Sequence, residues 1–376
     1  MSRPTDRTRI AVLLDHGWAE TQPFAREPIA ALAAEGFAID VVARETDAWT
    51  DIPGVRYIPR RALSHPSAQA LMARLAADGL RRRDYAMVVA TPPVSVVAGT
   101  ALAQISGAPL VVLHDELWTS WNARMSPRLR RAMFRAHERA ALTIITDLRR
   151  VPVLVGDWPG LRGHEFVELP NCPAGPLHAR PRATVRAELG IGPDTLMVLN
   201  AGSLTRMMGL HDLLHALPEL PADAVLVCQA ASRATGLDPG LVELVESRYP
   251  VRFRLHPLPY DQVDDIVAAA DIGIALYRSD SPNFRYCGKG SGKLNRYLRA
   301  GKPVIVDRNA SLEWVAERGA GVVVDGPHEI PAAIERIRSD YDRFAAAATR
   351  CFDADLAFDT HWPTVRAALG RVLVGG

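Results

Sequence analysis

The chain has 376 residues, 48% of them hydrophobic and 23% charged, with a formal net charge of +2. This composition is that of a globular protein, the near-neutral charge argues against a nucleic-acid partner, and the length predicts two domains. Four widely spaced cysteines indicate neither a disulfide framework nor a zinc site. The N-terminal region lacks the apolar run of a signal peptide or a membrane span, so we expect a cytoplasmic protein.

Short β-branched runs alternate with alanine-rich stretches along the chain, which is typical of parallel sheets with crossover helices. In the first half we predict strands over 10–14, 38–43, 86–90, 110–113 and 142–145, and helices over 28–35, 68–79, 94–106 and 127–141. After a stretch rich in proline, strands resume over 196–200, 224–228, 251–255, 272–276, 304–306 and 322–324.

These elements predict an α/β fold of two Rossmann-like domains, with a ligand cleft between the carboxyl ends of their two sheets. The first domain spans residues 1–170, a linker spans 171–185, and the second domain spans 186–355. A C-terminal helix over 356–376 is expected to cross back to the first domain.

The lysines are the most unusual feature of the second half. Lys289, Lys293 and Lys302 are the chain's only lysines and fall within fourteen consecutive residues, whereas the other 41 of its 44 cationic side chains are arginines. Lysine is a compact point charge and arginine a planar fork, so this stretch indicates a place where a small cation is needed.

The loop around these lysines has the composition of a phosphate site. Gly288, Gly290 and Gly292 allow close backbone approach to a ligand, Ser291 offers a hydroxyl, and Lys293 begins a predicted helix. The spacing does not fit a Walker A loop. The alternative is a flexible surface loop with solvated lysines.

A second candidate anion site follows the strand over 196–200. The turn contains Gly202, with Ser203, Thr205 and Arg206 as side-chain donors, and we expect free backbone amides where the next helix starts. A plain strand-to-helix turn is the alternative for this segment taken alone.

Residues 288–306 resemble the second-domain signature of the two-domain glycosyltransferases of the GT-B fold, above all glycosyltransferase family 4. Further similar stretches occur in the same order, at 169–171, the Gly202 turn, 251–262 and 268–275. The resemblance implies a nucleotide-diphosphate sugar held mainly by the second domain and a small-molecule or glycan acceptor held mainly by the first. It implies no metal and no other cofactor.

Carried over to this sequence, the resemblance places the diphosphate between the Gly202 turn and the start of the 293 helix, and the base near residues 256–260. The implied donor-binding residues are Gly202, Ser203, Thr205, Arg206, Leu258, Tyr260, Lys289, Gly290, Ser291, Gly292, Lys293, Asn295 and Arg296. The family commonly has two glutamates separated by seven residues, the second of which holds the ribose. Here Gly288 and Arg296 stand at those positions, and an arginine cannot accept the protons of ribose hydroxyls.

In the first domain, polar residues follow two predicted strands. His114 matches a histidine that family members often use to contact the transferred sugar, and Asp15 with His16 is a candidate acid–base pair. A capping or core histidine is the alternative for His114, and a polar turn residue is the alternative for His16. The candidate acceptor-binding aromatics are Trp18, Trp118 and Trp121.

A basic amphipathic helix is predicted around Arg128, Arg130, Arg131 and Arg135. Related enzymes with lipid-linked acceptors place such a face on anionic membranes, which makes peripheral membrane contact one expectation for this helix. The alternative is a solvated helix face packed on its own sheet.

The predicted function is a glycosyltransferase that moves a sugar from a nucleotide-diphosphate donor to an acceptor hydroxyl or amine, with retention of configuration. An inverting enzyme with His16 as the base is one alternative. A sugar-nucleotide 2-epimerase, which shares the double fold, and a non-catalytic sugar-nucleotide-binding protein are the others.

Overall fold

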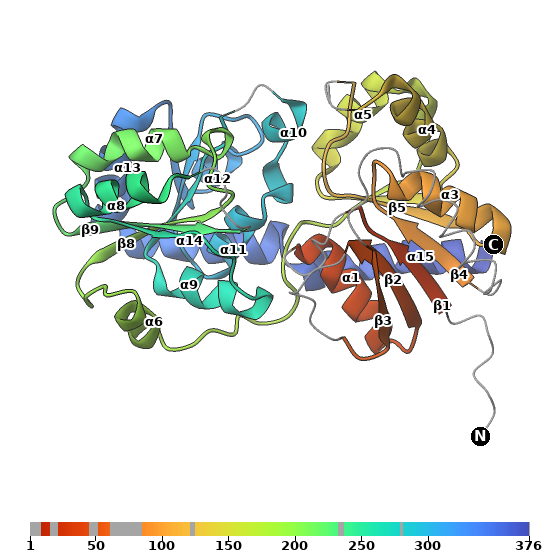
Figure 1. Cartoon of the computed structure of the whole chain (residues 1–376), viewed down its shortest axis with the longest axis horizontal. Coiled ribbons are helices and arrows are strands. Elements are labelled where there is room, and N and C mark those ends of the chain that lie inside the picture. The colour runs from red at the N-terminus through yellow and green to blue at the C-terminus, as the bar shows by residue number, and fades with distance from the viewer. Residues whose placement is uncertain are drawn as a thin grey trace. The chain divides into compact units, whose positions relative to one another are not determined.

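The computed structural model describes residues 9–15, 22–44, 52–60, 85–120, 125–231, 237–278 and 281–375. The chain divides into two compact units, unit 1 (Met1–Ala174 with His361–Gly376) and unit 2 (Gly175–Thr360) (Figure 1). The division falls within the proline-rich stretch, and the helix predicted over 68–79 lies outside the described residues.

Unit 1 contains a parallel sheet of seven described strands in the order β3-β2-β1-β4-β5-β6-β7. The strands are β1 (Arg9–Leu13), β2 (Ala38–Arg44), β3 (Val55–Arg60), β4 (Tyr85–Ala90), β5 (Leu110–His114), β6 (Leu142–Ile145) and β7 (Phe166–Glu168). The sequence did not predict β3 and β7. Both are edge strands of the sheet. β3 contains a proline and β7 is only three residues long, so neither shows a buried β-branched run in the sequence.

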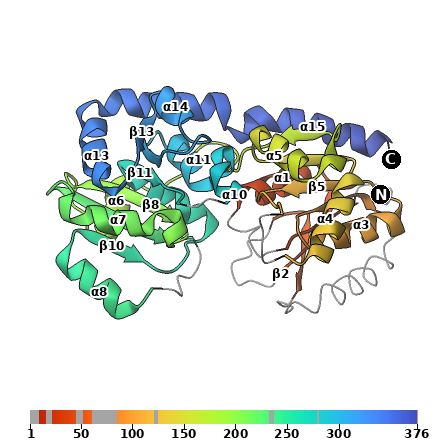
Figure 2. The ribbon, with the colours of Figure 1, turned by 90° about the horizontal axis from the view of Figure 1, so that it is seen from above.

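The described helices of unit 1 are α1 (Pro23–Ala34), α3 (Ser95–Ser106), α4 (Pro127–Glu138), α5 (Val151–Asp157) and most of α15 (Phe358–Gly375). α1 begins five residues before the predicted start, because Pro23 rather than Pro28 lies in its first turn. Right-handed crossovers put α1 and α3 on opposite faces of the sheet, and α4 packs beside α3 (Figure 2).

Unit 2 contains a parallel sheet of six described strands in the order β10-β9-β8-β11-β12-β13. The strands are β8 (Leu196–Gly202), β9 (Ala224–Ala230), β10 (Val251–Arg254), β11 (Ile272–Ala275), β12 (Val304–Asp307) and β13 (Gly321–Val324). All six were predicted from their β-branched runs, with ends that differ by at most two residues. The sheet order doubles back between β8 and β11, which makes that point the topological switch of unit 2.

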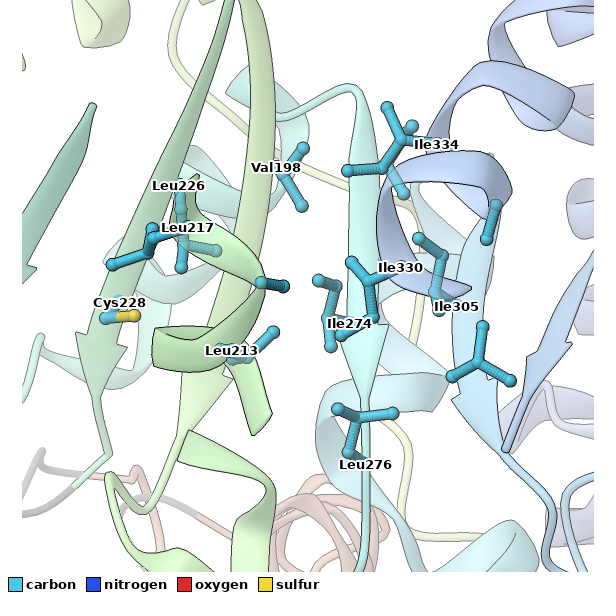
Figure 3. Close-up of a cluster of buried hydrophobic side chains, with 14 of the residues drawn as sticks. Val198, Leu213, Leu217, Leu226, Cys228, Ile274, Leu276, Ile305, Ile330 and Ile334 are labelled. Atoms are coloured by element: carbon cyan, nitrogen blue, oxygen red, sulfur yellow. The ribbon is translucent and has the colours of Figure 1, made fainter. Parts of the chain in front are cut away.

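Helices cover both faces of this sheet. They are α6 (Arg182–Glu188), α7 (Leu210–Ala216), α8 (Pro239–Arg248), α9 (Val263–Ala269), α10 (Pro282–Arg285), α11 (Gly292–Arg299), α12 (Trp314–Glu317), α13 (Ile330–Ser339) and α14 (Tyr341–Asp355). α6 begins inside the predicted linker of 171–185. Figure 3 shows the core on one face, where Leu213 of α7 and Ile330 and Ile334 of α13 point toward Ile274 of β11 and Ile305 of β12.

α11 packs on the opposite face of the sheet and approaches β11 very closely. A Cβ atom on Gly273 would lie 2.3 Å from the ring of Tyr297, so only glycine fits under this helix. The Tyr297 hydroxyl donates to the Leu199 carbonyl at 3.0 Å and accepts from the Ala201 amide at 2.7 Å. α11 is therefore fixed against the ends of both β8 and β11.

No helix in the described ranges is both long enough and apolar enough to cross a membrane. All four cysteines lie in described segments, where they are buried and form no disulfide.

Candidate functional site

The carboxyl ends of β8 and β11 meet at the switch point of unit 2. Open α/β sheets bind ligands outside the carboxyl ends of their strands at such a point. β8 ends at Gly202 and β11 is followed by Tyr277 and Arg278, so these segments border the expected ligand position.

Lys293 joins the two predicted halves of the donor site. Its Nζ donates to Asn200 Oδ1 at 3.3 Å and lies 5.0 Å from the ring centroid of Tyr277. A Cβ atom on Gly202 would lie 3.4 Å from Lys293 Cδ and 4.0 Å from its Nζ. The structure thus brings the Gly202 turn and the first turn of α11 into contact.

Burial makes the Lys293 ammonium an electrostatically strong group. Burial lowers the pKa of Lys293 to about 8, although the Asp307 carboxylate acts to raise it. The side chain is still a cation at neutral pH, and it is poorly solvated. A poorly solvated ammonium attracts a bound anion more strongly than a lysine fully exposed to water does.

Ser291 has a structural task in this structure. It is the N-cap of α11, where its Oγ accepts from the Leu294 amide at 3.3 Å, and it also hydrogen-bonds the Tyr277 hydroxyl. The hydroxyl that the sequence offers to a phosphate is therefore engaged in holding α11 against β11. Gly292 is the first residue of the helix.

The rest of the glycine-rich loop is held by hydrogen bonds to other residues of unit 2. Fully buried Asn295 donates its Nδ2 to the Lys289 carbonyl at 2.8 Å, and the Gly290 amide donates to Cys287 at 2.6 Å. Gly288 has a positive φ of 30° and donates its amide to Ser311 Oγ at 3.1 Å. The loop is a short 3-10 turn over Gly288–Gly290 with internal anchors.

The turn after Gly202 differs from the expectation of free amides. Gly209 and Leu210 donate their amides to the carbonyls of Arg206 and Thr205 at 3.1 and 3.2 Å. These two amides are thus satisfied inside the turn. Thr205 and Arg206 are exposed and Ser203 is half-buried, so this segment offers side chains.

Arg296 belongs to a buried ion network. Its guanidinium pairs with Asp264, which also accepts from Arg299 at 2.6 Å, and it lies over the Tyr260 ring at 4.8 Å. Tyr260, near which the resemblance places the base, therefore contacts α11, and Leu258 is half-buried. No carboxylate takes the place of the family's ribose-binding glutamate at position 296.

Two residues that the sequence reasoning passed over lie beside this site. Tyr277 and Asp307 line a cavity of about 660 Å³ within unit 2. Its other lining residues are Arg278, Arg285, Tyr286, Arg308, Asn309 and Ala310. A signal was present, because Tyr277 directly follows the predicted strand over 272–276 and Asp307 directly follows the predicted strand over 304–306. Polar side chains at such carboxyl ends meet ligands.

In unit 1, Asp15 is bound to the start of a helix. Its carboxylate accepts the amides of Val94 at 2.8 Å and Ser95 at 2.5 Å, and its own amide donates to Thr91 at 3.0 Å. Asp15 therefore joins β1 to α3 across the switch point of its sheet. The predicted partner His16, together with Trp18 and Trp121, lies outside the described residues.

His114 is buried in this structure. Its side chain is 1% exposed and its ring stacks on His137 of α4 at 5.4 Å, because the last residue of β5 points to the face that α4 covers. Neither ring nitrogen has a hydrogen-bond partner within the described part of the chain. Burial lowers the pKa of His114 to about 3, so its ring is neutral.

The remaining candidates of unit 1 are more exposed. Asp115, directly after β5, is half-buried, and burial together with the neighbouring Glu116 carboxylate raises its pKa to about 7. Trp118 is half-buried as well. On α4, Arg128, Arg131 and Arg135 are exposed and Arg130 is half-buried, opposite a buried apolar face.

No protein-family model matches the sequence, and a search of curated proteins finds no match. The structure matches solved structures over nearly its whole length. Sucrose-phosphate synthase from Thermosynechococcus elongatus aligns with a TM-score of 0.77 and 18% identity, covering 98% of this chain and 100% of that chain. HepE from Anabaena, solved with UDP and glucose, aligns with a TM-score of 0.75 and 16% identity over 96% of this chain and 99% of that chain.

WaaG, a glycosyltransferase involved in lipopolysaccharide biosynthesis, aligns with a TM-score of 0.67 and 17% identity over 98% of this chain and 100% of that one. The chain has the GT-B fold. The fold class that the sequence predicts is therefore confirmed. In this GT-B chain, His114 of unit 1 and Gly202 and Asp307 of unit 2 are the last residues of their strands.

Proposed function

We propose that the chain is a glycosyltransferase that moves a sugar from a nucleotide-diphosphate donor to an acceptor hydroxyl or amine. The observation that carries this proposal is the contact between Lys293 and the Gly202 turn at the switch point of unit 2. The GT-B fold supports it, and so do the solved complexes of HepE with UDP and with UDP-glucose.

In the proposed reaction, the bond between the sugar's anomeric carbon and the diphosphate oxygen breaks, and the acceptor atom forms a bond to that carbon and loses its proton. Negative charge grows on the leaving diphosphate. The poorly solvated Lys293 ammonium and the positive end of the α11 dipole stabilise that charge, and exposed Arg206 adds a second cation. Because these groups supply positive charge, we propose that transfer needs no metal and that activity survives treatment with EDTA.

We further propose retention of configuration, in which no strong protein base is required. The inverting alternative is favoured by one observation, the raised pKa of Asp115, which makes this carboxyl a second candidate base in addition to His16. Loss of nearly all transfer in both His16→Ala and Asp115→Asn, together with an inverted product, would establish inversion.

The donor site is tested by thermal shift with UDP, GDP, ADP and dTDP. Binding to the folded state raises the melting temperature, so at least one diphosphate should stabilise the wild type and should have little effect on Lys293→Ala. Lys302→Ala is the matched control. Burial also lowers the pKa of Lys302 to about 8. However, this residue precedes β12 and so lies at the amino end of the strand, opposite the carboxyl ends where the ligand is expected.

If no diphosphate stabilises the wild type, or if Lys293→Ala responds as Lys302→Ala does, the donor-site assignment is wrong. A glycosyltransferase should also release free diphosphate slowly from its sugar nucleotide in the absence of acceptor. A 2-epimerase would convert the sugar nucleotide without any acceptor, and a binding protein would leave it intact.

A further inference from the structure

The glycine-rich loop of this chain contains no carboxylate between Cys287 and Lys293. A sugar presents several hydroxyl donors, and carboxylates are the side chains that only accept hydrogen bonds when ionised. A donor bound at Lys293 therefore needs an acceptor group from another segment.

Asp307 is the carboxylate placed to supply it. It is the last residue of β12, 3% exposed, and interacts electrostatically with Lys293. One oxygen accepts the Tyr277 amide at 3.1 Å, which fixes the carboxylate at the carboxyl ends of β11 and β12.

The cavity next to Asp307 adjoins the diphosphate position. Tyr277 lines the cavity, and the same ring carries the Lys293 ammonium at 5.0 Å from its centroid. A group attached to a diphosphate at Lys293 would thus be one aromatic ring away from this space. The volume of about 660 Å³ lies within the range of roughly 300–1,000 Å³ of small-molecule sites.

The charged surroundings keep Asp307 ionised at neutral pH. Burial raises its pKa to about 6, against the opposing effects of Arg278 and Lys293. Arg285 and Arg308 also line the cavity, and no second carboxylate of the described residues does. Arg278 and Arg308 have their own partners in Asp212 and Asp325, so they do not neutralise Asp307 by direct pairing.

We propose that the cavity at Tyr277 and Asp307 binds the sugar of the donor, with Asp307 accepting hydrogen bonds from its hydroxyls. Asp307 is a positioning residue: it orients the sugar's anomeric carbon and takes no part in bond breaking. This inference rests on the proposed glycosyltransferase function, and it assigns to β12 the task that the loop at Gly288 cannot perform.

The test compares the affinity of each nucleotide diphosphate with that of its sugar nucleotide by calorimetry, for UDP with UDP-glucose, GDP with GDP-mannose, ADP with ADP-glucose and dTDP with dTDP-glucose. Asp307→Asn keeps an acceptor for the Tyr277 amide and removes the charge. It should weaken the sugar nucleotide about tenfold or more relative to its diphosphate, and leave diphosphate affinity within about twofold. Asp223→Asn, which alters an exposed carboxylate whose partner Arg338 is not among the cavity-lining residues, should change neither.

A pH profile gives a second readout that a purely structural role would not move. Sugar nucleotides have no free terminal phosphate to titrate, so wild-type affinity for them should fall as the pH drops through about 6, while Asp307→Asn stays flat. If Asp307→Asn does not fold, the wild-type profile alone decides.

The outcomes separate the two proposals. Diphosphate binding with an unchanged ratio in Asp307→Asn, or a wild-type profile that is flat from pH 7 to 5, overturns the sugar-site inference and leaves the proposed function in place. Absence of binding by every diphosphate to the wild type overturns both.

Discussion

At the scale of single residues, the most consequential group is a lysine that is paired with an amide oxygen rather than a carboxylate. Lys293 contacts Asn200 Oδ1, and its nearest carboxylate influence, Asp307, is weaker than the effect of burial. Lys293 has no direct counterion among the described residues, so it retains its capacity to bind an incoming anion. This distinguishes it from Arg296, whose charge is already compensated by Asp264.

This difference predicts how diphosphate binding depends on pH. Because the pKa of free Lys293 is about 8, the ammonium form is present below pH 8 and is lost above it. Affinity should be constant from pH 7 to 7.5 and then fall by up to about tenfold per pH unit. Calorimetry with the diphosphate of largest thermal shift measures this fall. Lys302→Ala should keep the profile and Lys293→Ala should abolish it, whereas a flat wild-type profile would contradict the role of Lys293.

At the scale of elements, α4 and the strands β5, β6 and β7 enclose a group of neutral histidines. His137 contacts Thr143 at 2.6 Å, Thr143 contacts His164 at 2.8 Å, and the His114 ring stacks on His137. Burial lowers the pKa of all three histidines. This part of unit 1 therefore folds around uncharged imidazoles.

The cluster predicts a loss of stability in acid. The unfolded chain protonates these histidines below pH 6.5, whereas the folded chain does not protonate His114 until about pH 3, so stability falls as the pH drops below 6.5. At pH 5.5, His114 alone should cost about 1.4 kcal/mol. His114→Phe, which breaks no hydrogen bond, should reduce the difference in unfolding free energy between pH 7.5 and 5.5 by that amount in guanidinium titrations. The exposed His211→Asn is the control, and an equal pH dependence in wild type and His114→Phe would refute this account.

The sequence predicted elements better than it predicted side-chain roles. Buried strands such as β8, β9 and β11 can be recognised in the sequence as short apolar runs, whereas an edge strand such as β3 cannot. The meeting of Gly202 with the Lys293 helix follows from parallel α/β topology alone. What could not be foreseen depends on packing, namely the use of Ser291 as a cap bonded to Tyr277 and the burial of His114 beneath α4. Asp307 was not predicted as a site residue, because a single carboxylate at the end of a strand is not part of a recognisable sequence motif.

At the scale of the whole molecule, the chain forms two units with separate cores, and α15 completes unit 1 from the far end of the sequence. Val365, Ala368 and Leu369 of α15 are at most 1% exposed, and Arg366 pairs with Glu35. Leu213 of α7 has the corresponding place in the core of unit 2.

This organisation predicts local effects of core substitutions. Leu369→Ala and Leu213→Ala should each cost about 2–5 kcal/mol, because both leave a cavity in a packed core. Hydrogen exchange followed by mass spectrometry should show faster exchange in β1, β4 and β5 for Leu369→Ala, and in β8, β9 and β11 for Leu213→Ala. Equal acceleration in both units by either variant would show that they unfold as one.

The return of α15 to unit 1 also fixes an order of events during synthesis. Unit 2 is an unbroken stretch, Gly175–Thr360, and can complete its core once that stretch has left the ribosome. Unit 1 is made first but lacks Val365 and Leu369 until α15 emerges. The unit whose synthesis begins first is therefore completed only after all of unit 2 has been made, and part of its apolar core stays uncovered until then.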